Sequence, residues 1–300
     1  MPEVSHIKQE IEDTAENRFR TPAVMRATML ALSYLVPPLA VKLATYLFCR
    51  PKRGLIKPDE EGTMAAAESF DLDINGQRLA AWSWGNGPTV LLQHGWSSRG
   101  SRLAGFVAPL TAAGFRVVSY DAPAHGESEG RITTGPDISR TLREIASRLG
   151  GLHSIIAHSM GCWVAALAMK EGLLVERLVF ISPPSDLSLF SDLFARQMGF
   201  TPKIQKRVEE ILAKRTGVPW SEMKAEGLSV GQDTPLLIIH DRGDLVVLLH
   251  HAEALHNAWK GSRLLITSGL GHRLTVKDSE VVTSTVEFIA ERPAAGRIRT

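Results

Sequence analysis

From about Met64 onward the chain alternates between short apolar runs and longer amphipathic stretches, and this alternation limits the possible folds more than any other feature. Strand patterns that alternate with helical patterns predict βαβ units, which place the strands in a mostly parallel sheet flanked by helices. The runs are apolar at nearly every position, as is typical of strands buried on both faces. The expected elements are strands at Thr89–Gln93, Phe115–Tyr120, Ser154–Ala157, Leu178–Ser182, Leu236–His240 and Arg263–Thr267, helices at Ile138–Leu149, Cys162–Lys170, His251–Trp259 and Val276–Ala290, and an edge hairpin of Phe70–Ile74 and Arg78–Trp84 around Asn75-Gly76-Gln77.

One long segment interrupts this α/β pattern. Residues 185–234 contain no convincing strand, but they contain helical patterns at Leu187–Met198 and Lys203–Arg215. Such a segment is too long for an ordinary loop. We therefore expect a small helical cap, inserted after the sixth core strand between core segments 63–184 and 235–300.

Residues 1–62 form an N-terminal arm with an apolar centre. Residues 27–41 carry no charge, but two prolines and Lys42 interrupt the apolar run, which is too broken for the roughly 20 residues of a spanning helix. We expect a helical arm that packs on the domain or lies on a membrane surface, with a spanning arm as the less favoured alternative. An acidic stretch before the run argues against a cleaved signal peptide. A basic flank follows the run, made of Arg50, Lys52, Arg53 and Lys57.

Charge and cysteine content exclude several classes of protein. The formal net charge is +2 and no basic block dominates, so no nucleic-acid partner is expected. Cys49 and Cys162 are the only cysteines, which favours two free thiols in a reducing compartment. We therefore expect a cytoplasmic protein, which the N-terminal arm could also attach to a membrane. The sequence gives no indication of the oligomeric state.

No cofactor or metal is expected. The chain has neither a GxGxxG loop after a strand nor a GxxxxGK[ST] loop, so nucleotide cofactors are not indicated. His250, His251 and His256 do not share one helical face at the spacing of metal ligands. They are interpreted as a solvated helix face.

The strongest motif is Ala157-His158-Ser159-Met160-Gly161, where an expected strand runs directly into an expected helix. A serine at such a junction turns sharply so that its hydroxyl projects above the sheet edge, and its neighbours two residues away must be small. Ala157 and Gly161 meet this requirement. The structural alternative is that Ser159 only caps the following helix.

A histidine follows the last expected strand, in the glycine-rich sequence Gly269-Leu270-Gly271-His272. The glycines can adopt backbone conformations that bring the imidazole across the sheet edge. A neutral imidazole can take the proton of a serine hydroxyl and return it to a leaving group. His272 is therefore the candidate general base for Ser159.

With these motifs the chain resembles the α/β-hydrolase superfamily, over roughly residues 69–290. Its elbow has the family's small-x-Ser-x-small form, with alanine where glycine is commoner. Three other motifs follow the family order: His94-Gly95 after the first parallel strand, Asp121-Ala122-Pro123-Ala124-His125-Gly126-Glu127-Ser128 after the next, and His240-Asp241-Arg242-Gly243-Asp244 after the insert. Ala124 replaces the family's usual glycine, and Asp241 stands where glycine is also usual.

The resemblance implies further roles. The backbone N–H groups of Trp96 and Met160 would form the oxyanion hole, and Asp244 would orient His272. Asp241 and Asp186 remain rival carboxylates. His94 is expected to brace its loop and His125 to belong to the scaffold, with a catalytic His125 as the minority alternative.

The resemblance implies a serine hydrolase that cleaves a carboxylic ester or thioester of a small or acyl-chain substrate through a Ser-His-Asp triad. The alternatives are a carbon–carbon bond hydrolase, an amidase or an acyltransferase on the same triad, or a non-catalytic binding member of the fold. A serine elbow argues against family members with an aspartate nucleophile. Apolar cap residues could form a roof over an acyl chain or only pack the cap on the core; they are Leu187, Leu189, Phe190, Leu193, Phe194, Met198 and Phe200.

Overall fold

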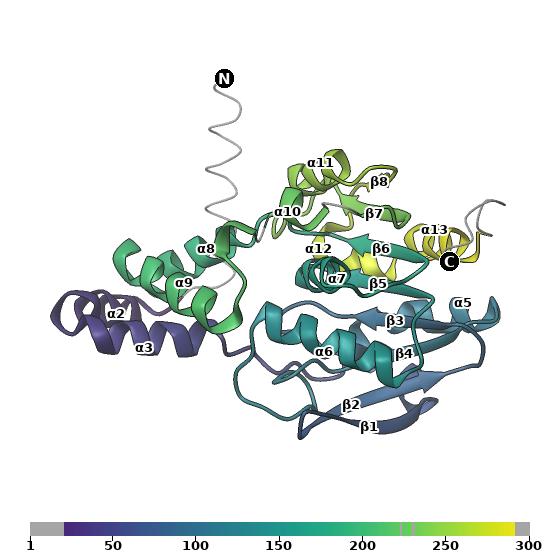
Figure 1. Cartoon of the computed structure of the whole chain (residues 1–300), viewed down its shortest axis with the longest axis horizontal. Coiled ribbons are helices and arrows are strands. Elements are labelled where there is room, and N and C mark those ends of the chain that lie inside the picture. The colour runs from purple at the N-terminus through teal and green to yellow at the C-terminus, as the bar shows by residue number, and fades with distance from the viewer. Residues whose placement is uncertain (1–20, 223, 230–231, 292–300) are drawn as a thin grey trace.

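The computed structural model describes residues 21–222, 224–229 and 232–291, and these build one eight-stranded sheet with helices on both faces (Figure 1). The strand order is β1-β2-β4-β3-β5-β6-β7-β8. β1 and β2 are antiparallel, as is the β2–β4 pair, and every later pair is parallel. The strands are β1 (Glu68–Ile74), β2 (Gln77–Trp84), β3 (Thr89–Gln93), β4 (Arg116–Tyr120), β5 (Ser154–His158), β6 (Arg177–Ile181), β7 (Leu236–Asp241) and β8 (Arg263–Thr267).

The apolar runs occupy the centre of the sheet, as the sequence predicts. β5 and β6 are buried along their whole length, whereas the edge strand β1 has exposed residues at positions 68, 69, 71 and 73 and is buried only at Ile74. Because side chains point alternately to the two faces of a strand, Leu91 and Ile155 pack on one face and Val90 and Ile156 on the other. Both faces therefore need a helical cover.

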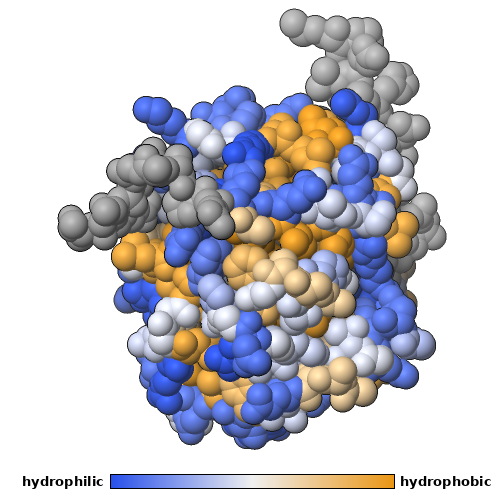
Figure 2. Space-filling view, turned by 90° about the vertical axis from the view of Figure 1, so that its right-hand side faces the viewer, coloured by the Kyte–Doolittle hydropathy of each residue, from blue (hydrophilic) through white to orange (hydrophobic). Residues whose placement is uncertain are grey.

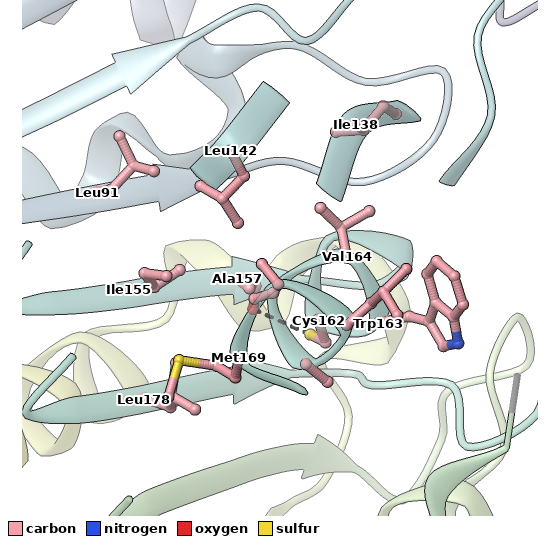
Figure 3. Close-up of a cluster of buried hydrophobic side chains, with 14 of the residues drawn as sticks. Leu91, Ile138, Leu142, Ile155, Ala157, Cys162, Trp163, Val164, Met169 and Leu178 are labelled. Carbon is pink, nitrogen blue, oxygen red and sulfur yellow. Dashed lines mark hydrogen bonds between the residues drawn. The ribbon is translucent and has the colours of Figure 1, made fainter. Parts of the chain in front are cut away.

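Helices α6, α7 and α11 cover one face, and η1, α5 and α13 cover the other. Figure 3 shows Leu91, Ile155 and Leu178, from three adjacent strands, facing the side chains of α6 and α7. Trp163 of α7 is fully buried there and lies where a side chain on Gly135 would stand. The bounds of these helices are η1 Gly100–Phe106, α5 Val107–Ala112, α6 Gly135–Arg148, α7 Met160–Lys170, α11 Leu249–Ala258, α12 Gly271–Leu274, η3 Thr275–Lys277 and α13 Ser279–Ala290.

The segment 185–234 is helical in the part that the structure describes. Its two main helices lie where the sequence predicts them, and Pro202 occupies the first position of the second one, where its missing N–H costs nothing. They lie beyond one end of the sheet, not over its faces (Figure 1). The elements of this segment are α8 (Ser188–Met198), α9 (Pro202–Thr216), η2 (Trp220–Glu222) and α10 (Ala225–Ser229).

The described part of the N-terminal arm is a helical hairpin that packs on this insert. α2 (Ala23–Leu35) and α3 (Pro37–Phe48) are separated by Val36, since the prolines that follow end one helix and start the next. Ala40 and Ala44 of α3 are buried against α9. α4 (Pro58–Ala65) then leads into β1. No helix among the described residues is long and apolar enough to cross a membrane, and the acidic stretch at residues 1–20 lies outside the described residues.

Two buried histidines fix the loops that follow β3 and β4. His94 Nε2 accepts the N–H of Ala122 at 2.9 Å, so its Nδ1 donates to the Gly95 carbonyl at 2.8 Å. His125 Nε2 accepts the N–H of Ser97 at 3.1 Å, and its Nδ1 donates to the Pro123 carbonyl at 3.0 Å. The two side chains thus tie one loop to the other, which agrees with the bracing roles expected for them.

A buried carboxylate organises the same region. Asp121 accepts the N–H groups of Gly100 and Glu127, both at 2.7 Å, and lies 3.5 Å from the guanidinium of the buried Arg99. Gly126 has a φ of +42°, and a side chain there would overlap the Asp121 carboxylate. The Asp121–Ser128 motif is therefore a compact turn built around this carboxylate.

These loops make the stability of the protein depend on pH. Burial lowers the pKa of His94 to about 4 and that of His125 to about 3. Since these values lie below the ordinary one of about 6.5, the unfolded chain binds more protons between pH 6.5 and about 4. We expect the free energy of unfolding to be highest above pH 7 and to be about 2 kcal/mol lower at pH 5 for each histidine.

Urea denaturation at about pH 7.5 and about pH 5 measures this loss. The His125→Gln variant should lose less stability between the two values than the wild type does. His256→Gln is the control, because His256 is a half-buried helix residue that bonds to Ser262. An equal loss in His125→Gln and wild type would show that His125 does not carry this dependence.

Candidate active site

Ser159 lies at the turn between β5 and α7 in a strained conformation. Its φ is +55° and its ψ is −130°, a combination that a residue with a side chain rarely adopts. The N–H of Ser159 donates to the Ile181 carbonyl of the next strand at 2.9 Å, which helps to hold the turn. The strand-to-helix elbow that the sequence predicts is present. Its side chain makes no N-capping hydrogen bond, which speaks against the alternative that Ser159 only caps the helix.

The structure gives a physical reason for the small residues around Ser159. A Cβ on Gly161 would lie 2.6 Å from the backbone carbonyl oxygens of both Gln93 and His94. A Cβ on Gly95 would lie 3.0 Å from the Cβ of Ser159. The end of β3 and the start of α7 are therefore in backbone contact, which brings the loop after β3 against the serine.

The loop after β8 carries His272 to this serine. Gly269 and Gly271 have φ values of +83° and +60°, the left-handed region in which glycine is unstrained. His272 Nε2 lies 3.1 Å from Ser159 Oγ, and His272 Nδ1 lies 2.7 Å from Asp244 Oδ2. The structure thus brings together the three side chains expected from the sequence, although they are far apart in the chain.

Asp244 is buried, and its charge is balanced by hydrogen bonds. Its Oδ1 accepts the N–H groups of Val246 and Val247, each at 2.9 Å, while its Oδ2 faces His272. Burial raises the pKa of Asp244, but His272 and the two N–H groups outweigh this effect and hold the pKa below its ordinary value. Asp244 is therefore an ionised carboxylate at neutral pH.

The rival carboxylate Asp241 has other partners. Its Oδ1 accepts the N–H groups of Gly243 and Gly271, and its Oδ2 accepts the N–H of Leu270 and the hydroxyl O–H of Thr267. All four distances lie between 2.9 and 3.1 Å. Asp241 thus holds the loop that carries the histidine, without contacting the imidazole.

The other rival, Asp186, lies at the start of the insert. Its Oδ1 accepts the N–H of Ser188 at 2.8 Å, and its Oδ2 lies 3.7 Å from Lys224 Nζ. These contacts connect two parts of the segment 185–234. The contacts of Asp186 are therefore with residues of the insert and not with the imidazole of His272.

Two histidines of this site were not expected from the sequence. His158 Nε2 donates to the His272 backbone carbonyl at 2.9 Å, and the two rings lie 4.8 Å apart. Burial lowers the pKa of His158 to about 3, so it is neutral. His240 Nε2 donates to the Val247 carbonyl at 2.8 Å and lies 3.7 Å from Asp244 Oδ2. Both belong to motifs already quoted from the sequence, one residue before Ser159 and one before Asp241, and this position is the signal that could have revealed their roles.

One expectation about the histidines is wrong. The sequence predicts that His251 lies on a solvated helix face, but it is buried, and its Nδ1 lies 2.8 Å from Ser185 Oγ. Burial lowers the pKa of His251 to about 4. The helical spacing places this residue on the inner face of α11, whereas the adjacent His250 is exposed. Among the described residues no cluster of three His, Cys, Asp or Glu could hold a metal ion.

The two residues expected to supply the oxyanion donors lie on the two segments that meet at the serine, the start of α7 and the loop after β3. Met160 is the first residue of α7, so its N–H has no carbonyl partner within the helix. Trp96 follows Gly95, the residue that approaches Ser159, and its side chain packs edge-on against the ring of His125. The side chains of both residues are half-buried.

Five of the seven expected roof residues divide into two groups, and the side chain of Leu189 lies outside the part of the structure that is described. Leu187 and Phe190 pack in the same apolar cluster as Trp96 and Met160. By contrast, Phe194 of α8 faces the N-terminal hairpin and packs edge-on against Phe48, with ring centroids 5.2 Å apart. The apolar residues of the insert that pack with the hairpin include Phe194, Met198 and Phe200.

The two cysteines are free and buried. Burial raises the pKa of Cys49 to about 11 and that of Cys162 well above its ordinary value. Both are therefore neutral thiols in the described structure. Cys162 Sγ donates to the Ala157 carbonyl at 3.2 Å, just behind the elbow (Figure 3).

Comparisons with known proteins agree with this fold. A pimeloyl-(acyl-carrier protein) methyl ester esterase of Nitrosomonas europaea is 28% identical over 231 residues, which cover 63% of this chain and 90% of that protein. An esterase of Pyrococcus furiosus superposes with a TM-score of 0.61 at 22% identity, over 80% of this chain and 96% of that one. A membrane phospholipase A superposes with a TM-score of 0.59 at 18% identity, over 88% of this chain and 94% of that one.

An esterase of Exiguobacterium antarcticum also has this fold, with a TM-score of 0.58 at 16% identity over 75% of this chain and all of that one. The model of the alpha/beta hydrolase family matches residues 89–283, which run from β3 into α13 and include the elbow serine and the histidine beside it. This match spans well over half of the chain. The chain therefore belongs to the alpha/beta hydrolase family.

Proposed function

We propose that this enzyme hydrolyses a carboxylic ester through Ser159, His272 and Asp244. The observation that carries the proposal is the continuous line of hydrogen bonds from Asp244 Oδ2 to His272 Nδ1 and from His272 Nε2 to Ser159 Oγ. A serine hydroxyl is a weak nucleophile at neutral pH and needs a base within hydrogen-bond reach. An imidazole within reach of the hydroxyl and a carboxylate within reach of the imidazole support this assignment.

The first half of the reaction forms an acyl-enzyme. His272 Nε2 takes the proton of Ser159 Oγ as the oxygen attacks the ester carbonyl, and Asp244 stabilises the imidazolium that results. The backbone N–H groups of Trp96 and Met160 bind the negative charge that develops on the carbonyl oxygen. The imidazolium then gives its proton to the departing alcohol, which leaves the acyl group on Ser159.

The second half releases the acid. A water molecule takes the place of the alcohol, His272 accepts one of its protons, and the oxygen attacks the acyl carbon. Ser159 leaves with the proton from His272, so that the enzyme returns to its starting state. His158 and His240 hold the backbone carbonyls of His272 and Val247. They do not exchange protons near neutral pH, because burial keeps the pKa of His158 near 3 and lowers that of His240.

The substrate that we propose is an ester with an acyl chain. Support comes from the apolar side chains of Leu187 and Phe190, which belong to the same apolar cluster as Trp96 and Met160. The relative from Nitrosomonas europaea is named for a methyl ester of an acyl chain. In this proposal residues 185–234 act as the cap of the core formed by 63–184 and 235–300. A cytoplasmic location, with or without membrane association, remains part of the proposal.

Replacing the serine tests the nucleophile. We expect a fluorophosphonate probe to modify Ser159 in the wild type, located by mass spectrometry, and to leave Ser159→Ala unmodified. Hydrolysis of p-nitrophenyl esters should fall by a factor of about 10³ or more in the variant, because the covalent path is lost.

The matched control is Ser185→Ala. Ser185 lies after the neighbouring strand and bonds to His251, not to His272. Its loss should leave probe labelling intact. Folded wild type that resists the probe and hydrolyses no ester would instead favour a non-catalytic role.

The two carboxylates Asp244 and Asp241 should respond differently to the change to asparagine. Asp244→Asn is expected to lower kcat by about 10⁴-fold with an unchanged fold, since the amide cannot hold the same imidazole tautomer. Asp241→Asn places an NH2 group against backbone N–H donors and should lower the free energy of unfolding by about 2 kcal/mol. Steady-state kinetics and urea denaturation of both variants provide the comparison. The assignment fails if Asp241→Asn abolishes turnover at full stability while Asp244→Asn remains active.

A further inference from the structure

The α2–α3 hairpin exposes an apolar tip. Tyr34 is 73% exposed and Leu35 79%, and Val36 and Leu39 beside them are about half exposed. Pro37 and Pro38 complete the turn, and they are exposed as well. These six residues, 34–39, form a continuous apolar surface, which we call the hairpin tip. In Figure 1 the hairpin lies at the end of the molecule farthest from α5 and α13.

α2 lacks the polar outer face of an ordinary surface helix. Only Ser33 is buried in it, with Met29 and Leu32 half-buried, yet most of its exposed side chains are apolar. A helix that is apolar on all sides belongs inside a protein or against lipid. The opposite side of the molecule has an ordinary surface, on which hydrophilic residues are spread among hydrophobic ones (Figure 2).

The segments that form and support the hairpin carry an excess of positive charge. Residues 21–57 contain six Lys or Arg residues and no Asp or Glu. Residues 188–216, the two helices on which the hairpin packs, contain six Lys or Arg and three acidic residues. Together these segments have a formal charge of +9, although the whole chain has only +2. The remainder of the protein is therefore acidic, and the excess of positive charge is concentrated in these two segments.

We propose that the α2–α3 hairpin docks this enzyme on the surface of an anionic lipid bilayer. The hairpin tip enters the boundary between headgroups and acyl chains, and the cations around it contact the lipid phosphates. α2 has 13 residues, about 20 Å at 1.5 Å per residue, which is shorter than a hydrocarbon core of about 30 Å. The hairpin therefore lies in one leaflet. This inference does not rest on the chemistry proposed for Ser159.

The charge distribution favours lipid over a second copy of the chain. Two hairpins that met tip to tip would bring two sets of cations together, with Arg26 and Lys42 on each side of the contact and no acidic residue in either hairpin. A bilayer with anionic headgroups supplies the opposite charge around the same apolar centre. Each cation near such a surface contributes about 1 kcal/mol to binding.

Flotation of the purified full chain with lipid vesicles tests the proposal. We expect binding to vesicles of equal parts phosphatidylcholine and phosphatidylglycerol, and weak binding to phosphatidylcholine alone. Leu35→Asn with Leu39→Asn should weaken binding to the mixed vesicles at least about tenfold, because the apolar side chains no longer leave water. Arg26→Gln with Lys42→Gln should weaken it about fivefold per cation, and added salt should have the same effect.

Leu174→Asn is the matched control, since Leu174 is 70% exposed but lies after α7, outside the hairpin. It should bind like the wild type. All variants should keep the wild-type circular dichroism spectrum and the wild-type rate on a soluble ester, and Ser159→Ala should still bind vesicles. Failure of the wild type to float with the mixed vesicles overturns the proposal. So does a lipid-free dimer that the Leu35/Leu39 double variant dissociates, because the tip would then be an interface between copies.

Discussion

The close contact between the end of β3 and the first turn of α7 is the constraint on which the site depends. Gly161 has no room for a side chain beneath the carbonyl groups of Gln93 and His94, and Gly95 returns against Ser159 from the other side. This contact brings the loop after β3 against the strained serine, beside the first turn of α7. Because the strain is imposed by packing between rigid elements, the serine side chain is held in one direction before any substrate arrives.

Three buried carboxylates hold the loops at the edge of the sheet where the site lies. Asp121, Asp241 and Asp244 each accept at least two backbone N–H groups. Only Asp244 also faces the imidazole of His272. Backbone N–H groups thus replace the water that these charges lose on folding, and the loops that supply them become rigid. The catalytic geometry proposed here is therefore supported by carboxylates that never contact the substrate.

The core of the fold could be predicted from the sequence because the parallel strands are apolar at nearly every position, and the elbow because a strand-to-helix turn at a serine requires small neighbours. Ser159 and His272 follow from such local patterns. Composition does not distinguish Asp244 from Asp241. The difference arises because the N–H groups of the loop that carries His272 bond to the carboxylate of Asp241. The burial of His251 and the contact of His158 with the His272 carbonyl depend on tertiary packing, which helical spacing alone does not specify. The division of the insert's aromatic residues between core and hairpin was hidden for the same reason.

The packing of the hairpin on the insert has a practical consequence for shortening the protein. Ala40 and Ala44 of α3 cover a stripe on α9 that includes Ile204, Val208 and Leu212, all of which are buried. Removing the N-terminal arm would open this stripe to water and leave the insert without one of its supporting surfaces. A truncated enzyme would lose the apolar surface of the hairpin tip but would expose a new apolar surface on α9. Polar substitutions on the outer side of the hairpin preserve the inner contact, and they are the better route to a form that stays monodisperse at high concentration.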